Sequence, residues 1–305
     1  MVPKYQPSVL EQWAYHKERF KVLDRVIELE STYIDSSDIY DDNEDLLGKY
    51  FKKYPQQRYK VYLATKFGGV YSPEMKTFSI RGDKQYVHEA CAKSLSRLGL
   101  DTIDLYYVHR IDKTVPIEET MEALKELVHQ GKIKYIGLSE CSCETLRRAY
   151  AVHPVACVQI EYSPFSLDIE RDEIGLLKTC RELGVTIVCY SPLGRGMLTG
   201  QIKSPDDFAA DDFRRILPRS DCKEGCTSGQ LTLAWILAQG EDFIVIPGAS
   251  KIKNLEENVA AVRVQLNKAE LAEIREACKK ADVIGDRYPA FAMDSLFSDS
   301  APKKN

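Results

Sequence analysis

Seven short runs of aliphatic, aromatic and β-branched residues recur along the chain, and each run is apolar at almost every position. A strand exposed on one face alternates apolar and polar residues, whereas a strand buried on both faces is apolar throughout. The pattern therefore predicts a parallel sheet covered on both sides. Its expected strands span residues 32–37, 61–67, 104–109, 135–140, 157–162, 186–193 and 243–249.

The segments between these runs carry apolar residues at the three- and four-residue spacing of a helix with one buried face. Helices are expected over 19–29, 86–98, 117–130 and 173–183. The last three are each followed by a glycine that can end a helix, namely Gly99, Gly131 and Gly184. Repeated alternation of strand and helix indicates βαβ units.

Two further helices begin at residue pairs typical of a capping box, Thr227 with Gln230 and Asn267 with Glu270. The stretch 201–226 has no helical or strand periodicity and is rich in Asp and Arg, so an exposed loop is expected there. The strand–helix pattern therefore continues on both sides of one long irregular segment.

Two parallel architectures fit this order. A doubly wound sheet usually carries a glycine fingerprint after its first strand, and neither G-x-G-x-x-G nor G-x-x-x-x-G-K-[ST] occurs. A (β/α)8 barrel instead gathers its chemistry at the C-terminal ends of several strands. We therefore expect an α/β fold of the (β/α)8 TIM-barrel type over residues 18–293, incomplete because seven strands are recognisable. Residues 1–17 form an atypical N-terminal segment, and 294–305 are expected to be a disordered tail.

Composition narrows the class further. Of 305 residues, 44% are hydrophobic and 29% charged, with a net charge of −4, which excludes a disordered chain and a basic nucleic-acid surface. No apolar run reaches the ~18–20 residues of a membrane span, and the N-terminus lacks an apolar leader. We expect a cytoplasmic protein with free thiols. The cysteine pairs 141/143 and 222/226 lack further ligands at zinc spacing, so no metal site is predicted.

Four residues suited to acid–base chemistry fall at or just after successive strand ends: Asp35, Tyr40, Lys66 and His109. A tyrosine with a pKa near ~10 is a weak acid at neutral pH. An ammonium group beside it stabilises the phenolate, and a carboxylate can hold that ammonium in place. A histidine can bond to a carbonyl oxygen or relay a proton. The set favours protonation of a carbonyl oxygen, with a hydride from a reduced nicotinamide attacking the carbon.

Each of the four also has a structural explanation. Asp35 and Lys66 could form a purely structural ion pair, Tyr40 could be a wall residue, and His109 could be a hydrogen-bonded core histidine. Their occurrence together at successive strand ends favours the catalytic interpretation.

Longer motifs around these residues resemble those of the aldo-keto reductases, in particular a fungal and plant branch. Residues 33–40 resemble the aspartate–tyrosine motif, ATKFG (64–68) the lysine motif, and DTIDLYYVHRID (101–112) the histidine motif. The match continues in order through GKIKYIGLSE (131–140), VQIEYSPFSL (158–167), YSPLGRGMLTG (190–200) and IPGASKIKNLEEN (246–258).

The resemblance implies NADPH-dependent reduction of an aldehyde or ketone, with Tyr40 as proton donor. Ser139 and Gln159 match residues that hold the nicotinamide carboxamide, and Tyr190 matches the aromatic residue that stacks on the ring. The expected pyrophosphate loop comprises Ser191, Leu193, Gly194 and Arg195. The expected adenosine-end residues are Gly248, Ser250, Lys251, Glu257 and Asn258. Positive charge at Lys251, with Arg195 and Lys253, favours NADPH over NADH because it can neutralise the extra phosphate.

The chain departs from the resembling family in two places. The family's first strand, of the type LGLG-x-M-G, is replaced by MVPKYQPSVLEQWAYHKE, and the residues Ser220 to Gly225 stand where an outer helix is expected. Both departures leave open a non-catalytic NADP-binding regulatory barrel or an inactive shortened form. Tyr288 and Phe291 could line a substrate pocket or serve ordinary loop packing; the substrate itself is not defined by these patterns.

Overall fold

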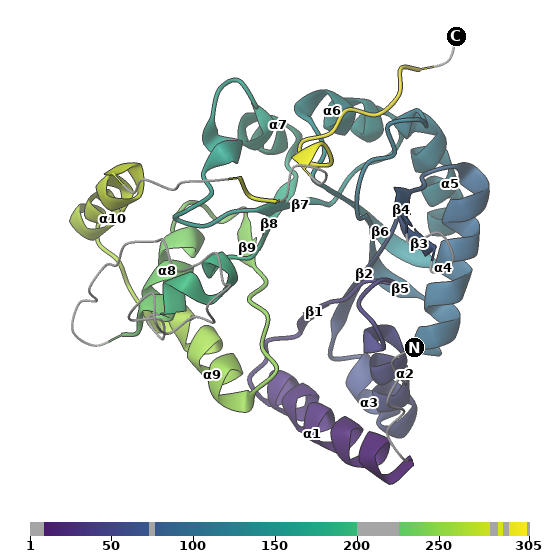
Figure 1. The fold of residues 1–305 in the computed structure, drawn as a ribbon, viewed down its shortest axis with the longest axis horizontal. Helices are drawn as coiled ribbons and strands as arrows, with labels where there is room; N and C mark the ends of the chain where they lie inside the picture. The colour runs from purple at the N-terminus through teal and green to yellow at the C-terminus, as the bar shows by residue number, and fades with distance from the viewer. Residues whose placement is uncertain (1–8, 73–76, 200–225, 281–285, 289–292, 304–305) are drawn as a thin grey trace.

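The structure, a computed structural model, describes residues 9–72, 77–199, 226–280, 286–288 and 293–303. One curled parallel sheet organises it, with helices on its outer side (Figure 1). The strands lie in the order β1-β2-β5-β6-β7-β8-β9, so each is beside its neighbour in sequence apart from a small separate hairpin. They span Tyr33–Asp35, Tyr62–Phe67, Ile103–Val108, Ile133–Ser139, Cys157–Glu161, Thr186–Tyr190 and Phe243–Val245. The predicted fold, a (β/α)8 type with seven strands, is confirmed.

Helices follow the strands as the periodicity predicts. They are α1 (Val9–Glu28), α2 (Asn43–Lys53), α3 (Pro55–Arg58), α4 (Lys84–Leu98), α5 (Ile117–His129), α6 (Cys143–Val152), α7 (Leu176–Leu183), α8 (Ser228–Leu237), α9 (Ile252–Ala260) and α10 (Lys268–Lys280). Thr227 and Gln230 form the predicted capping box at α8. Among the described residues, no helix is both long and apolar enough to cross a membrane.

The sheet does not close into a ring in the described part of the chain. Its outer strands β1 and β9 have three residues each and do not pair with one another. On the outside, α1 and α9 lie side by side (Figure 1), and Arg25 Nε donates to Glu256 Oε1 at 2.8 Å. Among the described residues, the outer edges of β1 and β9 are therefore both unpaired.

Side chains alternate between two apolar layers, as they must along a strand. The inner layer, enclosed by the curl, is small and consists of Ala64, Leu105, Tyr107, Cys157 and Val188. The outer layer between sheet and helices is large and includes Leu63, Phe67 and Tyr106. This alternation decides which polar residues at the strand ends point inward.

Two expectations about the chain ends need correction. The predicted disordered tail is wrong for the described residues 293–303, because the Ser298 backbone bonds to Glu140 and Ser142, and Ser298 and Ser300 are buried. Arg148 Nη2 also donates to the Ala301 carbonyl at 2.8 Å. The expected boundary at residue 18 falls inside one helix, α1. All of the loop expected over 201–226 except residue 226 lies outside the described residues. The same holds for Ser220 to Gly225, which stand where an outer helix is expected.

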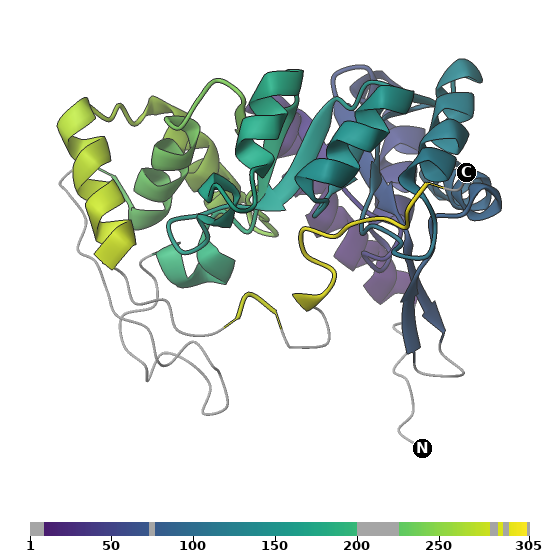
Figure 2. The ribbon, with the colours of Figure 1, turned by 90° about the horizontal axis from the view of Figure 1, so that it is seen from above.

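A hairpin that the sequence pattern did not predict leaves the end of β2. It pairs β3 (Gly69–Ser72) with β4 (Thr77–Ile80) in antiparallel fashion. Figure 2 shows it projecting beyond the sheet on the side where the C-terminal segment runs.

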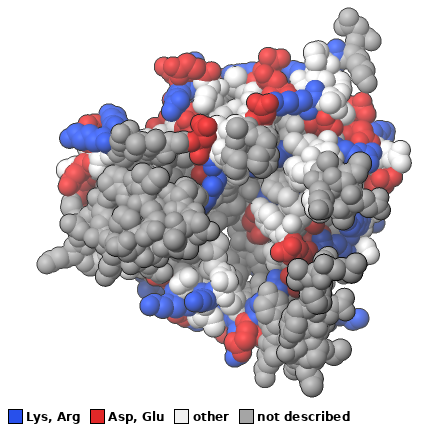
Figure 3. All heavy atoms as spheres, viewed as in Figure 1, with Lys and Arg blue, Asp and Glu red and all other residues white. Residues whose placement is uncertain are grey.

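On the face in Figure 3, acidic and basic described side chains are interspersed.

Candidate active site

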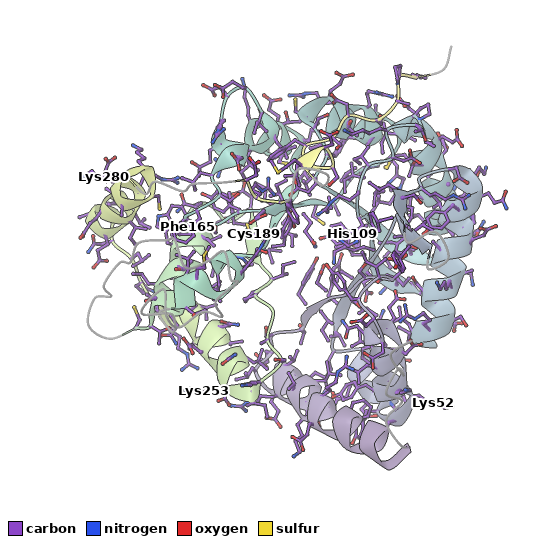
Figure 4. All side chains as sticks on the ribbon, in the orientation of Figure 1. Lys52, His109, Phe165, Cys189, Lys253 and Lys280 are labelled. Atoms are coloured by element: carbon purple, nitrogen blue, oxygen red, sulfur yellow. The ribbon has the colours of Figure 1, made fainter. Side chains whose placement is uncertain are left out.

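Strand alternation brings three of the four predicted catalytic residues to the inner side of the curl. Lys66 lies two positions after the inward-facing Ala64, and His109 two positions after Tyr107. Asp35 holds the same relation to Tyr33, which packs against this inner layer. Figure 4 shows His109 toward the centre of the curve. The separate strand ends therefore converge on one place.

Lys66 is held by two oxygen atoms and is completely buried. Its ammonium forms an ion pair with Asp35 and donates to the Ser36 carbonyl at 2.7 Å. An unpaired ammonium at this depth would cost several kcal/mol, and the Asp35 carboxylate offsets that cost. The predicted role of Asp35 as the anchor of Lys66 agrees with this geometry.

Tyr40 completes the cluster from the loop between β1 and α2. The Lys66 ammonium lies 4.8 Å from the centre of the Tyr40 ring, and the His109 ring meets that ring edge-on with centroids 5.8 Å apart. The Tyr40 hydroxyl makes no hydrogen bond with any described residue, and the side chain is exposed. The structure thus brings all four predicted residues together and leaves the phenol open to a ligand.

His109 is neutral at physiological pH. Burial, followed by the charges of Lys66 and Arg110, holds the pKa of His109 well below its usual range. Its Nδ1 lies 3.2 Å from the Ser37 hydroxyl. A neutral imidazole with one nitrogen occupied presents the other to a substrate.

Of the residues expected around the nicotinamide carboxamide, Ser139 ends β6 and Gln159 lies in the middle of β7, and both are buried. Gln159 Nε2 donates to the second oxygen of Asp35 at 2.8 Å, and Ser139 Oγ accepts from Arg110 Nη1 at 3.3 Å. Neither link was predicted. The first of these bonds places Gln159 directly beside the Asp35–Lys66 pair.

Tyr190 belongs to a charged network that sequence reasoning missed. Its hydroxyl donates to Glu140 Oε1 at 2.6 Å. Arg287, from the short described segment 286–288, contacts Glu140 Oε1 at 2.5 Å, Glu161 Oε2 at 3.1 Å and the Tyr190 hydroxyl at 3.1 Å. Tyr288 also reaches that hydroxyl, at 3.2 Å. The network fixes Tyr190 from two distant parts of the chain.

Burial and neighbouring charges both shift the pKa values of the residues in this network. Burial raises the pKa of Glu161, partly offset by Arg287, while burial and the Glu140 charge raise the pKa of Tyr190. Despite opposing burial, the surrounding acidic groups raise the pKa of Arg287. The Tyr190 phenol is therefore neutral at physiological pH. A lone arginine in a C-terminal loop carries no sequence signal that would have revealed this role.

The expected pyrophosphate loop has an unusual backbone. Ser191, Gly194, Arg195 and Gly196 all have positive φ angles, from 49° to 93°. The N–H groups of Gly194 and Gly196 donate to the Ser191 and Leu193 carbonyls at 2.9 and 3.0 Å, so the segment forms a tight turn. Leu193 precedes this turn and is the N-terminal neighbour of Gly194.

The expected adenosine end lies between β9 and α9. A methyl group added at Gly248 would meet no atom within 4 Å, so open space adjoins the backbone there. Lys251 is the N-cap residue of α9 and makes no side-chain capping bond, while Ser250 before it is exposed. Positive charge and unpaired N–H groups at a helix start fit a phosphate group.

Glu257 and Asn258, expected beside them, lie further along α9. Glu257 Oε1 accepts from the Thr227 hydroxyl at 2.7 Å, and its carbonyl accepts from Gln230. In this structure Glu257 therefore ties α9 to the capped start of α8. Phe291 falls outside the described residues.

Comparisons with known proteins agree with this geometry. Residues 12–279 match the aldo/keto reductase family. An aldo-keto reductase of Strobilurus tenacellus is 53% identical over 304 residues, covering 94% of this chain and 88% of the relative. An aldo-keto reductase of Schizosaccharomyces pombe, named as using NADP(+), is 50% identical over 301 residues, covering 92% and 88%. The chain belongs to the aldo/keto reductase family.

A solved structure supports the fold independently. The aldo-keto reductase from Klebsiella pneumoniae in complex with NADPH superposes with a TM-score of 0.69 at 27% identity, covering 88% of this chain and 87% of that one. The chain is thus an oxidoreductase of the aldo-keto reductase type built on an incomplete barrel.

Proposed function

We propose that the chain reduces an aldehyde or ketone to an alcohol at the expense of NADPH, with Tyr40 as proton donor. The observation that carries this proposal is the convergence of Asp35, Tyr40, Lys66 and His109 at the inner strand ends. Family membership and a relative named for NADP(+) support the cofactor.

The residues along the expected cofactor path suit a dinucleotide. Open space at Gly248, the left-handed turn at Gly194 to Gly196 and the cation at Lys251 would receive the adenosine phosphate and the pyrophosphate. Ser139, Gln159 and the anchored Tyr190 would position the nicotinamide. When bound, NADPH supplies the hydride that the carbonyl carbon accepts.

The protein's own residues handle the proton. The Tyr40 phenol donates its proton to the carbonyl oxygen as that oxygen gains negative charge. The Lys66 ammonium, fixed by Asp35, stabilises the phenolate that remains. His109, in the tautomer with its proton on Nε2, donates a hydrogen bond to the same oxygen, and its Nδ1 faces the Ser37 hydroxyl at 3.2 Å.

Turnover of NADPH with a carbonyl compound tests this proposal. Tyr40→Phe removes the proton and leaves the ring, so the rate is expected to fall about 10²–10⁴-fold while NADPH affinity stays unchanged. The matched control is Tyr59→Phe, at an exposed tyrosine that precedes β2. Full activity of Tyr40→Phe would contradict the assigned role.

A non-catalytic NADP-binding barrel is the second candidate, and the unpaired edges of β1 and β9 favour it. It predicts NADPH binding by the wild-type chain without NADPH oxidation in any carbonyl screen. Since Lys66 and Tyr40 meet despite the open edge, the enzyme is the stronger proposal.

We place the protein in the cytoplasm. The eight described cysteines are free thiols, as expected in a reducing compartment. No group of described His, Cys, Asp or Glu side chains could hold a metal ion, and the proposed chemistry requires none.

A further inference from the structure

Exposed apolar side chains gather beside Tyr40. Eight large hydrophobic residues are exposed in the described part of the chain, and four of them occur in the turn after β1 and on the hairpin. These four are Ile39 (40% exposed), Tyr40 (41%), Tyr71 (59%) and Phe78 (57%). Singly exposed apolar residues are ordinary, but a contiguous patch marks a binding surface.

The hairpin register shows that the patch is contiguous. Tyr71 lies opposite Phe78, and Gly69 lies opposite Ile80. These two cross-strand pairs share one face of the hairpin. A methyl group added at Gly69 would lie 2.9 Å from Phe78 Cζ and 3.4 Å from Ile39 Cγ2. The Phe78 ring therefore covers the Gly69 backbone and comes close to Ile39.

Ile39 joins this face to the catalytic cluster, because the next residue is Tyr40. The hairpin itself begins at Gly69, three residues after Lys66. One apolar surface thus runs from the hairpin to the phenol proposed to protonate the substrate. Two-stranded hairpins are marginally stable on their own, and exposed aromatic rings on one face add no buried core. We define this surface, Ile39, Tyr71 and Phe78, as the hairpin wall.

We propose that the hairpin wall binds the apolar part of the substrate, so that the enzyme prefers carbonyl compounds bearing an aromatic or extended hydrocarbon group over hydroxylated ones. The proposal rests on the proposed function, because it requires the carbonyl to sit at Tyr40. A ring attached to that carbonyl extends across Ile39 and can pack against Phe78 and Tyr71. A polyhydroxylated chain would lose water there without gaining hydrogen bonds.

Steady-state reduction of 2-naphthaldehyde and of glyceraldehyde by the full chain tests the preference. Phe78→Ser is expected to raise KM for 2-naphthaldehyde about tenfold and to change KM for glyceraldehyde less than about twofold. Phe78→Leu keeps an apolar side chain and is expected to recover most of the loss. Tyr59→Ser, which removes an exposed tyrosine (91%) ahead of β2, is the matched control and should affect neither substrate.

The outcomes separate the two proposals. A wild-type chain that reduces neither aldehyde overturns the proposed function and this proposal with it. A wild-type chain that prefers glyceraldehyde, or a Phe78→Ser variant that loses both substrates equally or neither, overturns the hairpin wall alone. Wild-type self-association is a further outcome. If Phe78→Ser abolishes it and leaves both KM values unchanged, the patch binds a second copy of the chain and the hairpin-wall proposal is overturned. An unchanged thermal shift with NADPH confirms that the variants are folded.

Discussion

The two halves of the site satisfy their polar groups differently. On the proposed catalytic half, built by β1, β2 and β5, the Tyr40 hydroxyl has no hydrogen-bond partner among the described residues, while Lys66 beside it is bonded to Asp35 and to the Ser36 carbonyl. On the cofactor half, built by β6 to β9, expected ligands are bonded to protein groups. Gln159 donates to Asp35, and Tyr190 donates to Glu140.

This difference separates the residues proposed for proton transfer from the residues expected to bind the cofactor. Tyr40, the proposed proton donor, already lies beside the Lys66 ammonium, so the proposed catalytic half needs little reorganisation when a substrate arrives. The cofactor half has to share or exchange hydrogen bonds before Gln159 can bind a carboxamide. Substitutions on the first half should therefore affect turnover most, and those on the second should affect NADPH affinity.

The largest effect is expected from Lys66→Met. It removes the charge that stabilises the phenolate and leaves Asp35 without its cation, so the rate should fall at least about 10²–10⁴-fold. Loss of one partner of a buried pair should also cost about 3–5 kcal/mol of unfolding free energy. Turnover assays and urea unfolding measure the two effects.

The corresponding control is Lys84→Met, which removes an exposed lysine paired with Glu126. That change should cost about 1 kcal/mol or less and leave turnover intact. Similar effects of the two substitutions would show that Lys66 is an ordinary ion-pair residue.

Core substitutions sharpen the contrast between the sheet centre and its open edge. Leu63 on β2 is completely buried, whereas Val245 on the edge strand β9 is partly exposed. Leu63→Ala should lower the unfolding free energy by about 2–5 kcal/mol, and Val245→Ala by about 1 kcal/mol. Equal costs would indicate that another segment covers the β9 edge.

Arg287→Leu tests the network on the cofactor half. It leaves two buried carboxylates, Glu140 and Glu161, without their shared cation and removes one of the hydrogen bonds to Tyr190. Because net negative charge then faces the expected dinucleotide, NADPH affinity should fall about 10–100-fold. Fluorescence titration with NADPH measures this change. Arg171→Leu, at an exposed arginine paired with Asp168, should leave the affinity unaltered; equal weakening by both would refute a local role.

The smallest effect concerns Asp38, two residues before Tyr40, the proposed proton donor. Burial, and then the charge of Glu44, raises the pKa of Asp38 to about 6. The native state therefore holds this proton over a range in which the unfolded chain releases it, and its contribution to stability is lost as pH rises from about 4 to 6. Asp38→Asn should thus gain about 1–2 kcal/mol relative to wild type between pH 4.5 and 7. Urea unfolding of the variant and the wild type at pH 4.5 and at pH 7 measures this gain. Equal unfolding free energies would show that the pKa of Asp38 is not raised.

The sequence predicted that Asp35, Tyr40, Lys66 and His109 lie together, because strand periodicity and strand-end chemistry are local signals. Asp35, Lys66 and His109 share the inward phase of Tyr33, Ala64 and Tyr107, and that phase can be read from alternation. The glycine stops and both capping pairs were equally readable: Gly99 and Gly184 have left-handed φ angles of 62° and 68°, and Asn267 with Glu270 forms its box.

The remainder depends on contacts between distant segments. Arg287 meets Glu140 across 147 residues, and Ser300 reaches Thr145 across 155. Neither the polar tail SDSAPKKN nor a single arginine indicates such a partner. The hairpin was missed because Gly68 and Gly69 resemble a simple turn, and its apolar residues face solvent instead of a core.

Thermal unfolding of the purified chain with and without saturating NADPH tests the central claim most directly, namely that seven strands without a closing eighth still assemble the cofactor site. The account predicts one cooperative transition that NADPH shifts upward, since a ligand at ~100 times its Kd adds about 2.7 kcal/mol to the folded state. NADH should give a smaller shift. A transition that NADPH leaves in place, or no cooperative transition at all, would contradict it.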